Sequence, residues 1–90
     1  GFDLEQELLD VASRQMATLG ERLGVAEGDC HVETGNTGHT ILRVAEELGA
    51  DLILVGSHGR HGLAALLGST ARSVLNGAHC DVLAVRVPED

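Results

Sequence analysis

The stretch DLILVGSHGRHGLAALLGST, residues 51–70, decides the fold. Its first part, Asp51–Gly56, is a continuous apolar run with β-branched residues that ends at a glycine, which is typical of a strand buried on both faces of a parallel sheet. A glycine-rich loop follows, and Ser69–Asn76 then has the spacing of a helix that Gly77 ends. The residues of this helix expected to face inward are Ala71, Val74 and Leu75.

Another helix is predicted at Leu4–Leu23, where apolar residues recur at helical spacing and charged residues take the other faces. Asp3 is a suitable N-cap, and the Gln6 side chain is expected to reach back towards it as in a capping box. Gly24 is expected to end the helix, because glycine is the most common residue just past a helix terminus.

The rest of the chain continues this alternation of helices and strands. A short strand is predicted at Cys30–Thr34, followed by a helix that begins at Asn36 or Thr37 and ends at Gly49. The last strand is predicted at Asp81–Val87. Alternation of this kind indicates parallel strands joined by right-handed helical crossovers. The sequence therefore predicts one α/β domain over residues 1–90, an open parallel sheet with flanking helices.

Composition and charge argue against several classes of function. The chain has 90 residues and a formal net charge of −8, and all six of its cationic residues are arginines. Nucleic-acid backbones and anionic membranes attract basic surfaces, so neither is an expected partner. No window reaches the roughly 18 apolar residues of a membrane span, and the first residues do not resemble a signal peptide, so we expect a cytoplasmic protein. Cys30 and Cys80 lack zinc-type spacing and are expected to be buried thiols.

The loop that follows the strand is the main candidate site. In an open α/β sheet, ligands bind beyond the carboxyl ends of the strands. Glycines such as Gly56, Gly59 and Gly68 let backbone N–H groups approach a ligand closely. A helix that starts at Ser69 and Thr70 offers free N–H groups and a positive dipole end to an anion. These parts describe a phosphate cradle; the alternative is that the glycines only turn the chain.

Metal and catalytic chemistry have less support. His58 and His61 are three residues apart, but no carboxylate stands beside them in the loop, and a metal site needs three or four convergent ligands. We therefore predict no metal site, and His58 and Arg60 are more suited to donate hydrogen bonds to a bound phosphate. The sequence has no GxSxG nucleophile elbow and no oriented Cys–His pair, so no catalytic residue is predicted.

The quoted loop, together with VETGNTGHTILRVAEELGA before it and CDVLAVRV after it, resembles the C-terminal half of a universal stress protein (UspA-like) domain. ATP-binding members of that family carry a glycine, two residues, a second glycine, nine residues and then Gly-Ser or Gly-Thr. Gly56, Gly59 and Gly68-Ser69 take those places here, although only eight residues precede the last pair. The resemblance extends from about Leu4 to Val87.

This resemblance implies an adenine-nucleotide alpha-hydrolase-like, Rossmann-like sheet with strand order 3-2-1-4-5. The family's first strand, helix and second strand have no counterpart in the chain, which is therefore expected to be a C-terminal fragment of the domain. The implied ligand is ATP, either alone or with Mg²⁺, and the implied role is that of a stress-response sensor or regulator with at most slow ATP hydrolysis. The residues expected to contact the nucleotide are Val55, Gly56, His58, Gly59, Arg60, Gly68, Ser69 and Thr70.

The resemblance also implies a homodimer that pairs through the last strand, at Val82–Val87. The shortened glycine spacing leaves a second possibility open, in which the protein is a nucleotide-free dimeric interaction module of the same family.

Overall fold

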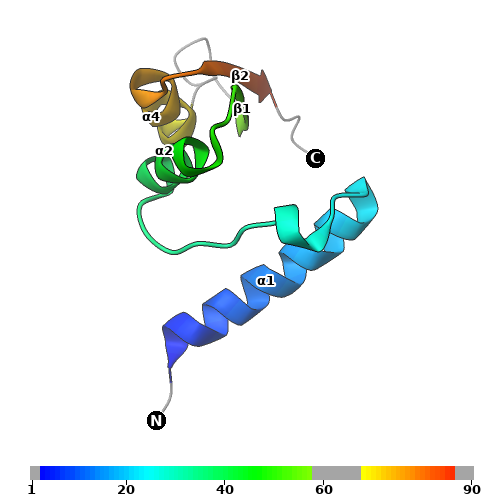
Figure 1. The fold of residues 1–90 in the computed structure, drawn as a ribbon. Helices are drawn as coiled ribbons and strands as arrows, with labels where there is room; N and C mark the ends of the chain where they lie inside the picture. Colours follow the sequence, from blue (N-terminus) through cyan, green and yellow to red (C-terminus); the bar gives the residue numbers. More distant parts are fainter. Residues whose placement is uncertain (1–2, 58–67, 87–90) are drawn as a thin grey trace. The chain divides into compact units, whose positions relative to one another are not determined.

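The computed structural model describes residues 3–57 and 68–86. The chain consists of two compact units, residues 1–34 and 35–90, and each is described by itself (Figure 1).

The first unit is built on one long helix, α1 (Leu4–Leu23). The predicted bounds and both caps are confirmed. The carboxylate of Asp3 accepts a hydrogen bond from the Gln6 backbone N–H at 3.2 Å, and Gly24 takes the left-handed conformation with φ of 70°. The prediction for the Gln6 side chain is wrong, because its amide donates to Asp10 at 3.0 Å, one turn further along the helix, where a carboxylate on the same face is within reach.

After α1 the chain turns through the short helix η1 (Glu27–Asp29). Gly20 is the buried residue of α1, and Cys30 packs against it so closely that a Cβ at Gly20 would lie 2.8 Å from the Cys30 sulfur. The predicted strand Cys30–Thr34 is not formed. A strand needs a hydrogen-bonded neighbour, and the sheet in the described ranges pairs only two other strands with each other. The thiols of Cys30 and Cys80 are free, and both are half-buried rather than fully buried.

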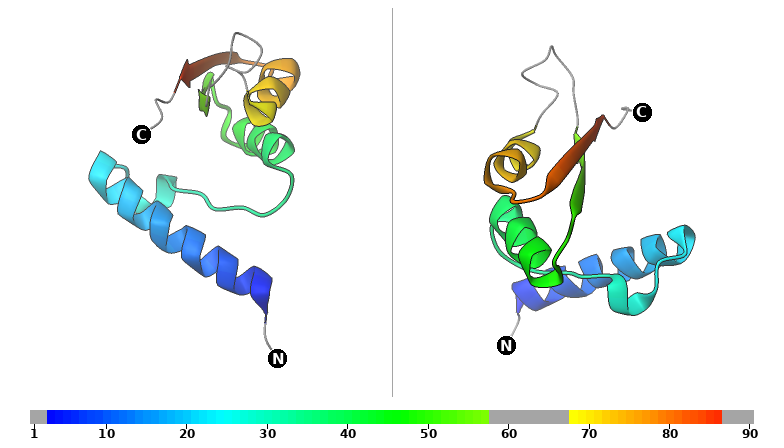
Figure 2. Two further views of the ribbon diagram at one scale, coloured as in Figure 1. Left: turned by 180° about the vertical axis from the view of Figure 1, so that it is seen from behind. Right: turned by 45° about the horizontal axis from the view of Figure 1, so that its top comes forward.

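The second unit contains α2 (Thr37–Leu48), β1 (Leu52–Ser57), α4 (Ser69–Gly77) and β2 (Asp81–Arg86). The two strands are parallel, in a register that runs from the pair of Leu52 with Asp81 to the pair of Ser57 with Arg86. Helices α2 and α4 pack together on one side of this sheet (Figures 1 and 2). The predicted α/β class with parallel strands is confirmed.

The structure refines the predicted bounds of the elements in this unit. Helix α2 begins at Thr37 with Asn36 as its N-cap, which settles its start. Helix α4 includes Gly77 as its last residue, one residue beyond the predicted end at Asn76, and Ala78 is its C-cap. Val87, predicted as the last residue of the final strand, lies outside the described residues.

The core of the second unit lies between the two helices and one face of the sheet. Its buried residues are Ile53, Ala71 and Val74, with exposed fractions of 8%, 2% and 0%. Two glycines bring the helices close together. A Cβ at Gly38 would lie 2.7 Å from the Ser73 Cβ, and one at Gly77 would lie 2.6 Å from a methyl carbon of Leu42. The predicted burial of Ala71 and Val74 is confirmed, whereas Leu75 is 42% exposed.

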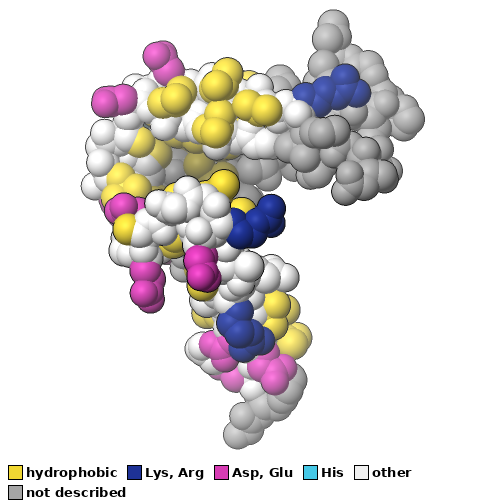
Figure 3. All heavy atoms as spheres, turned by 90° about the vertical axis from the view of Figure 1, so that its right-hand side faces the viewer, with side chains coloured by type: hydrophobic (Ala, Val, Ile, Leu, Met, Phe, Trp, Pro, Cys, Tyr) yellow, Lys and Arg dark blue, Asp and Glu magenta, His cyan; other side chains and the backbone are white. Residues whose placement is uncertain are grey.

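The opposite face of the sheet is apolar, and neither α2 nor α4 covers it. Side chains alternate between the two faces of a strand, and α2 and α4 lie on one side. The other side presents hydrophobic residues that gather over the strands in the upper part of Figure 3. These residues are Leu52, Leu54, Leu83 and Val85. The prediction that β1 is buried on both faces is therefore wrong for the described part of the chain, since Leu54 is 63% exposed.

Candidate functional site

The predicted phosphate loop leaves β1 at its carboxyl end and enters α4 at its N-terminus. Helix α4 contacts both strands and leads back to the start of β2, so its first residues lie beside the carboxyl end of β1 (Figure 2). Val55 and Gly56 are in the second half of β1, and Gly68, Ser69 and Thr70 form the start of α4. Among the predicted contact residues, the remaining three lie outside the described residues: His58, Gly59 and Arg60.

The N-terminus of α4 differs from those of α1 and α2. Asp3 caps α1 with its carboxylate, and the Asn36 side chain caps α2 by accepting from the His39 N–H at 3.0 Å. The N-cap of α4 is Gly68, which has no side chain to accept a hydrogen bond from the first turn. Among the described residues, no side chain caps the backbone N–H donors of this first turn. A helix start of this kind can accept an anion in place of the missing cap.

The conformation of Gly68 does not explain why a glycine stands there. Its φ of −60° and ψ of 168° suit any residue. A Cβ at this position would also meet no atom within 4 Å, so packing among the described residues does not exclude a side chain. Gly68 and Ser69 are exposed and Thr70 is half-buried. A glycine that neither backbone nor packing requires leaves the helix start open to a ligand's approach.

The first turn of α2 lies against the middle of α4. Gly38, in that turn, approaches Ser73, which is one turn into α4. The positive ends of two helix dipoles therefore lie on the same side of the second unit, and both favour negative charge near the carboxyl end of the sheet. The arrangement is suited to hold an anion through backbone N–H groups and hydroxyls.

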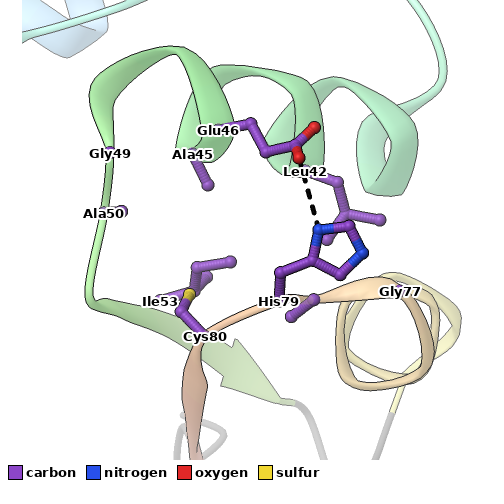
Figure 4. A pocket seen from close by; sticks show the side chains of 10 residues that line it. Leu42, Ala45, Glu46, Gly49, Ala50, Ile53, Gly77, His79 and Cys80 are labelled. Atoms are coloured by element: carbon purple, nitrogen blue, oxygen red, sulfur yellow. Dashed lines mark hydrogen bonds and ion pairs between the residues drawn. The ribbon is translucent and has the colours of Figure 1, made fainter.

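A second hollow, of about 230 Å³, lies at the opposite, amino ends of the strands (Figure 4). Its wall comes from the last turns of α2 and α4 and from the residues that lead into β1 and β2. At its rim the His79 Nδ1 lies 3.3 Å from a carboxylate oxygen of Glu46, and these side chains are 80% and 72% exposed. The lining residues are Leu42, Ala45, Glu46, Gly49, Ala50, Ile53, Gly77, Ala78, His79 and Cys80.

Sequence reasoning missed this hollow. Its lining comes from two separate stretches of the chain, residues 42–53 and 77–80, which include small residues such as Ala45, Ala50 and Ala78. Only the packing of α2 on α4 shows that the two stretches face one space. No group of three or more His, Cys, Asp or Glu side chains suited to a metal ion occurs in residues 3–57 and 68–86. Within those same ranges, no helix is long and apolar enough to cross a membrane.

Comparison with known proteins decides the family. The sequence model of the universal stress protein family matches residues 2–86. The chain belongs to the universal stress protein family. Its resemblance to this family, inferred from the glycine-rich loop and its flanks, is thereby confirmed.

Several curated universal stress proteins are similar to the chain. Universal stress protein A homolog 2 of Coxiella burnetii is 47% identical over 87 residues, which are 97% of this chain and 60% of the relative. Homolog 1 of the same organism is 41% identical over 87 residues, with the same coverage. Universal stress protein E of Escherichia coli (strain K12) is 38% identical over 72 residues, 79% of this chain and 23% of that protein. The chain thus spans about 60% of the length of the Coxiella relatives.

Proposed function

We propose that this universal stress protein chain binds the phosphates of ATP at the N-terminus of α4 and acts as a cytoplasmic sensor or regulator in the stress response. The observation that carries the proposal is the exposed start of α4, where Gly68 stands in place of a capping side chain. This start lies beside the carboxyl end of β1, which is where ligands bind in open α/β sheets. Membership of the family makes a nucleotide the favoured anion.

Each residue of the site has a role in this proposal. The backbone of Val55 lies near the ribose, and Gly56 and Gly59 let the loop backbone approach the phosphates. Backbone N–H groups of the first turn of α4 donate to phosphate oxygens, and the hydroxyls of Ser69 and Thr70 add to them. His58 and Arg60 supply further donors, and Mg²⁺ would bind the phosphates on their open side. The chain itself performs binding and orientation; no hydrolytic residue is assigned.

The phosphate half of the site can be tested separately from the adenosine half. The described residues at the start of α4 offer hydrogen-bond donors and a dipole, which recognise phosphate rather than a base. Tripolyphosphate should therefore compete with ATP for the 90-residue chain, whereas adenosine should not. The measurement is a titration calorimetry or NMR shift experiment at millimolar ligand. Absence of heat and of shifts with ATP at that concentration would overturn the proposal.

A charge substitution at the open glycine gives a sharper test. Gly68→Asp places a carboxylate where the phosphate would bind and also supplies the missing helix cap, so the helix should be retained while ATP affinity falls at least tenfold. Gly28→Asp is the matched control, because a Cβ at Gly28 also meets no atom within 4 Å and the net charge changes equally. Equal ATP affinity in the two variants would contradict the site assignment.

A dimeric interaction module is the second candidate. Two observations favour it: β2 lies at an edge of the sheet in the described ranges, and one residue fewer separates the second and third glycines than in ATP-binding relatives. An apolar edge strand readily pairs with a second copy, here through Val82–Val87. Sedimentation velocity at increasing concentration distinguishes the two roles: concentration-dependent dimers without any ATP response favour the module, and a monomer at 100 micromolar in roughly physiological salt argues against it.

A further inference from the structure

The hollow at the amino ends of the strands is a feature that the functional proposals leave unused. It has a volume of about 230 Å³ and lies in the second unit, where α2 and α4 end and where the chain enters β1 and β2 (Figure 4). The proposed phosphate site is at the opposite, carboxyl end of β1, beside the start of α4. A ligand in the hollow is therefore a separate ligand, and an inference about it does not rest on nucleotide binding.

The lining of the hollow is mostly apolar. Ile53 belongs to the buried core, and Leu42, Ala45 and Ala78 are half-buried, so part of the surface of each remains accessible. A water molecule takes about 30 Å³ in the liquid, so the hollow holds roughly seven such volumes. Pockets for drug-sized ligands are larger, at roughly 300–1,000 Å³. The hollow therefore suits a small ligand that has a short hydrocarbon part.

The two helix ends at the hollow favour a cation. The C-terminal ends of α2 and α4 both contribute to the wall, through Gly49 and Gly77 among others. The negative ends of two helix dipoles therefore lie beside the same space. Basic side chains can complement such an end: α1 has Arg22 in its last turn, whereas the last turns of α2 and α4 contain no basic residue. A positively charged ligand would supply this complementary charge to both helices.

Glu46 adds a carboxylate at the rim of the hollow. Its side chain extends from α2 towards His79, whose Nδ1 lies 3.3 Å from a carboxylate oxygen (Figure 4). These two side chains are 72% and 80% exposed, and water screens contacts of this kind, so the imidazole is easily replaced as the partner of Glu46. The described residues that line the hollow include no arginine. An ammonium group can therefore approach the Glu46 carboxylate without meeting an arginine in this lining.

We propose that the hollow binds a small aliphatic ammonium ion. The ammonium group donates hydrogen bonds to the Glu46 carboxylate, and the hydrocarbon chain packs on Leu42 and Ile53. Both parts of the ligand contribute, because an ion pair at an exposed rim is weak by itself and the apolar lining adds the burial of the chain. The same carboxylate and helix ends repel an anion of equal length, so the sign of the ligand's charge decides binding.

The test titrates hexylammonium, at millimolar concentration, into the 90-residue chain and follows the amide NMR signals. Shifts should occur in residues 42–53 and 77–80, which line the hollow. Glu46→Gln should weaken binding about three- to fivefold, the effect of losing an exposed ion pair. Glu47→Gln is the matched control, because it changes the net charge equally, but the Glu47 carboxylate pairs with Arg43 at 2.8 Å and does not line the hollow. His79→Gln should not weaken binding, because the ammonium group replaces the imidazole at Glu46.

Several outcomes would overturn this proposal. Hexanoate has a chain of the same length and the opposite charge, and equal binding of hexanoate would show that charge does not select the ligand. Equal loss of affinity in the Glu46→Gln and Glu47→Gln variants would show that the ammonium group does not meet Glu46. Shifts of equal size at Leu54 and Leu83 would mean that the ligand adsorbs to apolar surface in general. Absence of shifts in the unsubstituted chain would also refute the site, whether or not the variants fold.

Discussion

Ile53 and Leu54 are neighbours in β1, yet Ile53 is 8% exposed and Leu54 is 63% exposed. The first lies under the two helices. The second lies on the opposite side of the sheet, the outer face, together with Leu52, Leu83 and Val85. Both side chains are aliphatic, so their chemical type does not distinguish them. The difference in exposure comes from which side of the strand α2 and α4 cover. The comparison separates a residue that packs within the second unit from a neighbour that the described part of the chain leaves exposed.

The largest expected effect on stability comes from shortening Ile53, and the same change in Leu54 should have almost none. Ile53→Ala should lower the free energy of unfolding by about 2–5 kcal/mol, because it leaves a cavity under α2 and α4. Leu54→Ala should change it by no more than about 0.5 kcal/mol in the chain alone, because the side chain is already in water. Urea unfolding followed through the amide signals of β1 and β2 measures both. Similar losses in the two variants would show that the outer face is buried within this chain.

The helical layer over the inner face is sensitive to small additions. Gly38→Ala should destabilise the second unit by about 1–3 kcal/mol, because its new Cβ would lie 2.7 Å from the Ser73 Cβ. The double variant Gly38→Ala, Ser73→Gly removes that clash and should recover at least half of the loss. Gly28→Ala, at an open position, is the control and should remain within about 0.5 kcal/mol of the parent. Failure of the double variant to recover would mean that α2 and α4 are not in close contact here.

Removal of the N-cap side chain of α2 should have a smaller effect on stability. Asn36→Ala removes the side chain that accepts from the His39 N–H and should cost about 1 kcal/mol. Gly68→Asn supplies the equivalent cap to α4 and should gain a few tenths of a kcal/mol, because glycine is already an acceptable N-cap. Thermal unfolding by circular dichroism compares these variants. A loss on capping α4 would contradict the open helix start at Gly68.

The parts of the fold that depend on nearby residues could be predicted from the sequence. The bounds of α1 follow from its apolar spacing, from Asp3 and from Gly24, all within a turn of the helix ends. Helix α4 also begins at Ser69, where the sequence placed it, whereas β1 continues through Gly56 to Ser57, one residue past its predicted end. These features need only a local pattern and the chemistry of glycine and of helix caps.

The predictions that failed concern features that depend on residues far apart in the sequence. The segment Cys30–Thr34 has the composition of a strand but has no neighbour to pair with in the described sheet. Leu54 is an aliphatic residue of the kind found in cores, but it lies on a face of the sheet that neither α2 nor α4 covers. The hollow between α2 and α4 has no signal in any single stretch, because its lining residues come from two separate stretches, 42–53 and 77–80. Pairing and coverage are tertiary properties, which an apolar run alone does not specify.

The smallest expected effect on stability comes from an ion pair on the solvent-facing side of α2. Arg43 and Glu47 are one turn apart on α2 and form an ion pair of 2.8 Å, with side chains 48% and 58% exposed. Water and salt screen such a pair, so Glu47→Ala should cost no more than about 0.5 kcal/mol, and less still in 1 M salt. The measurement is the urea midpoint at low and high ionic strength. A cost above 1 kcal/mol that persists in high salt would show that this side of α2 is covered too. A further surface packed on α2 would then be needed to explain why solvent does not screen the ion pair.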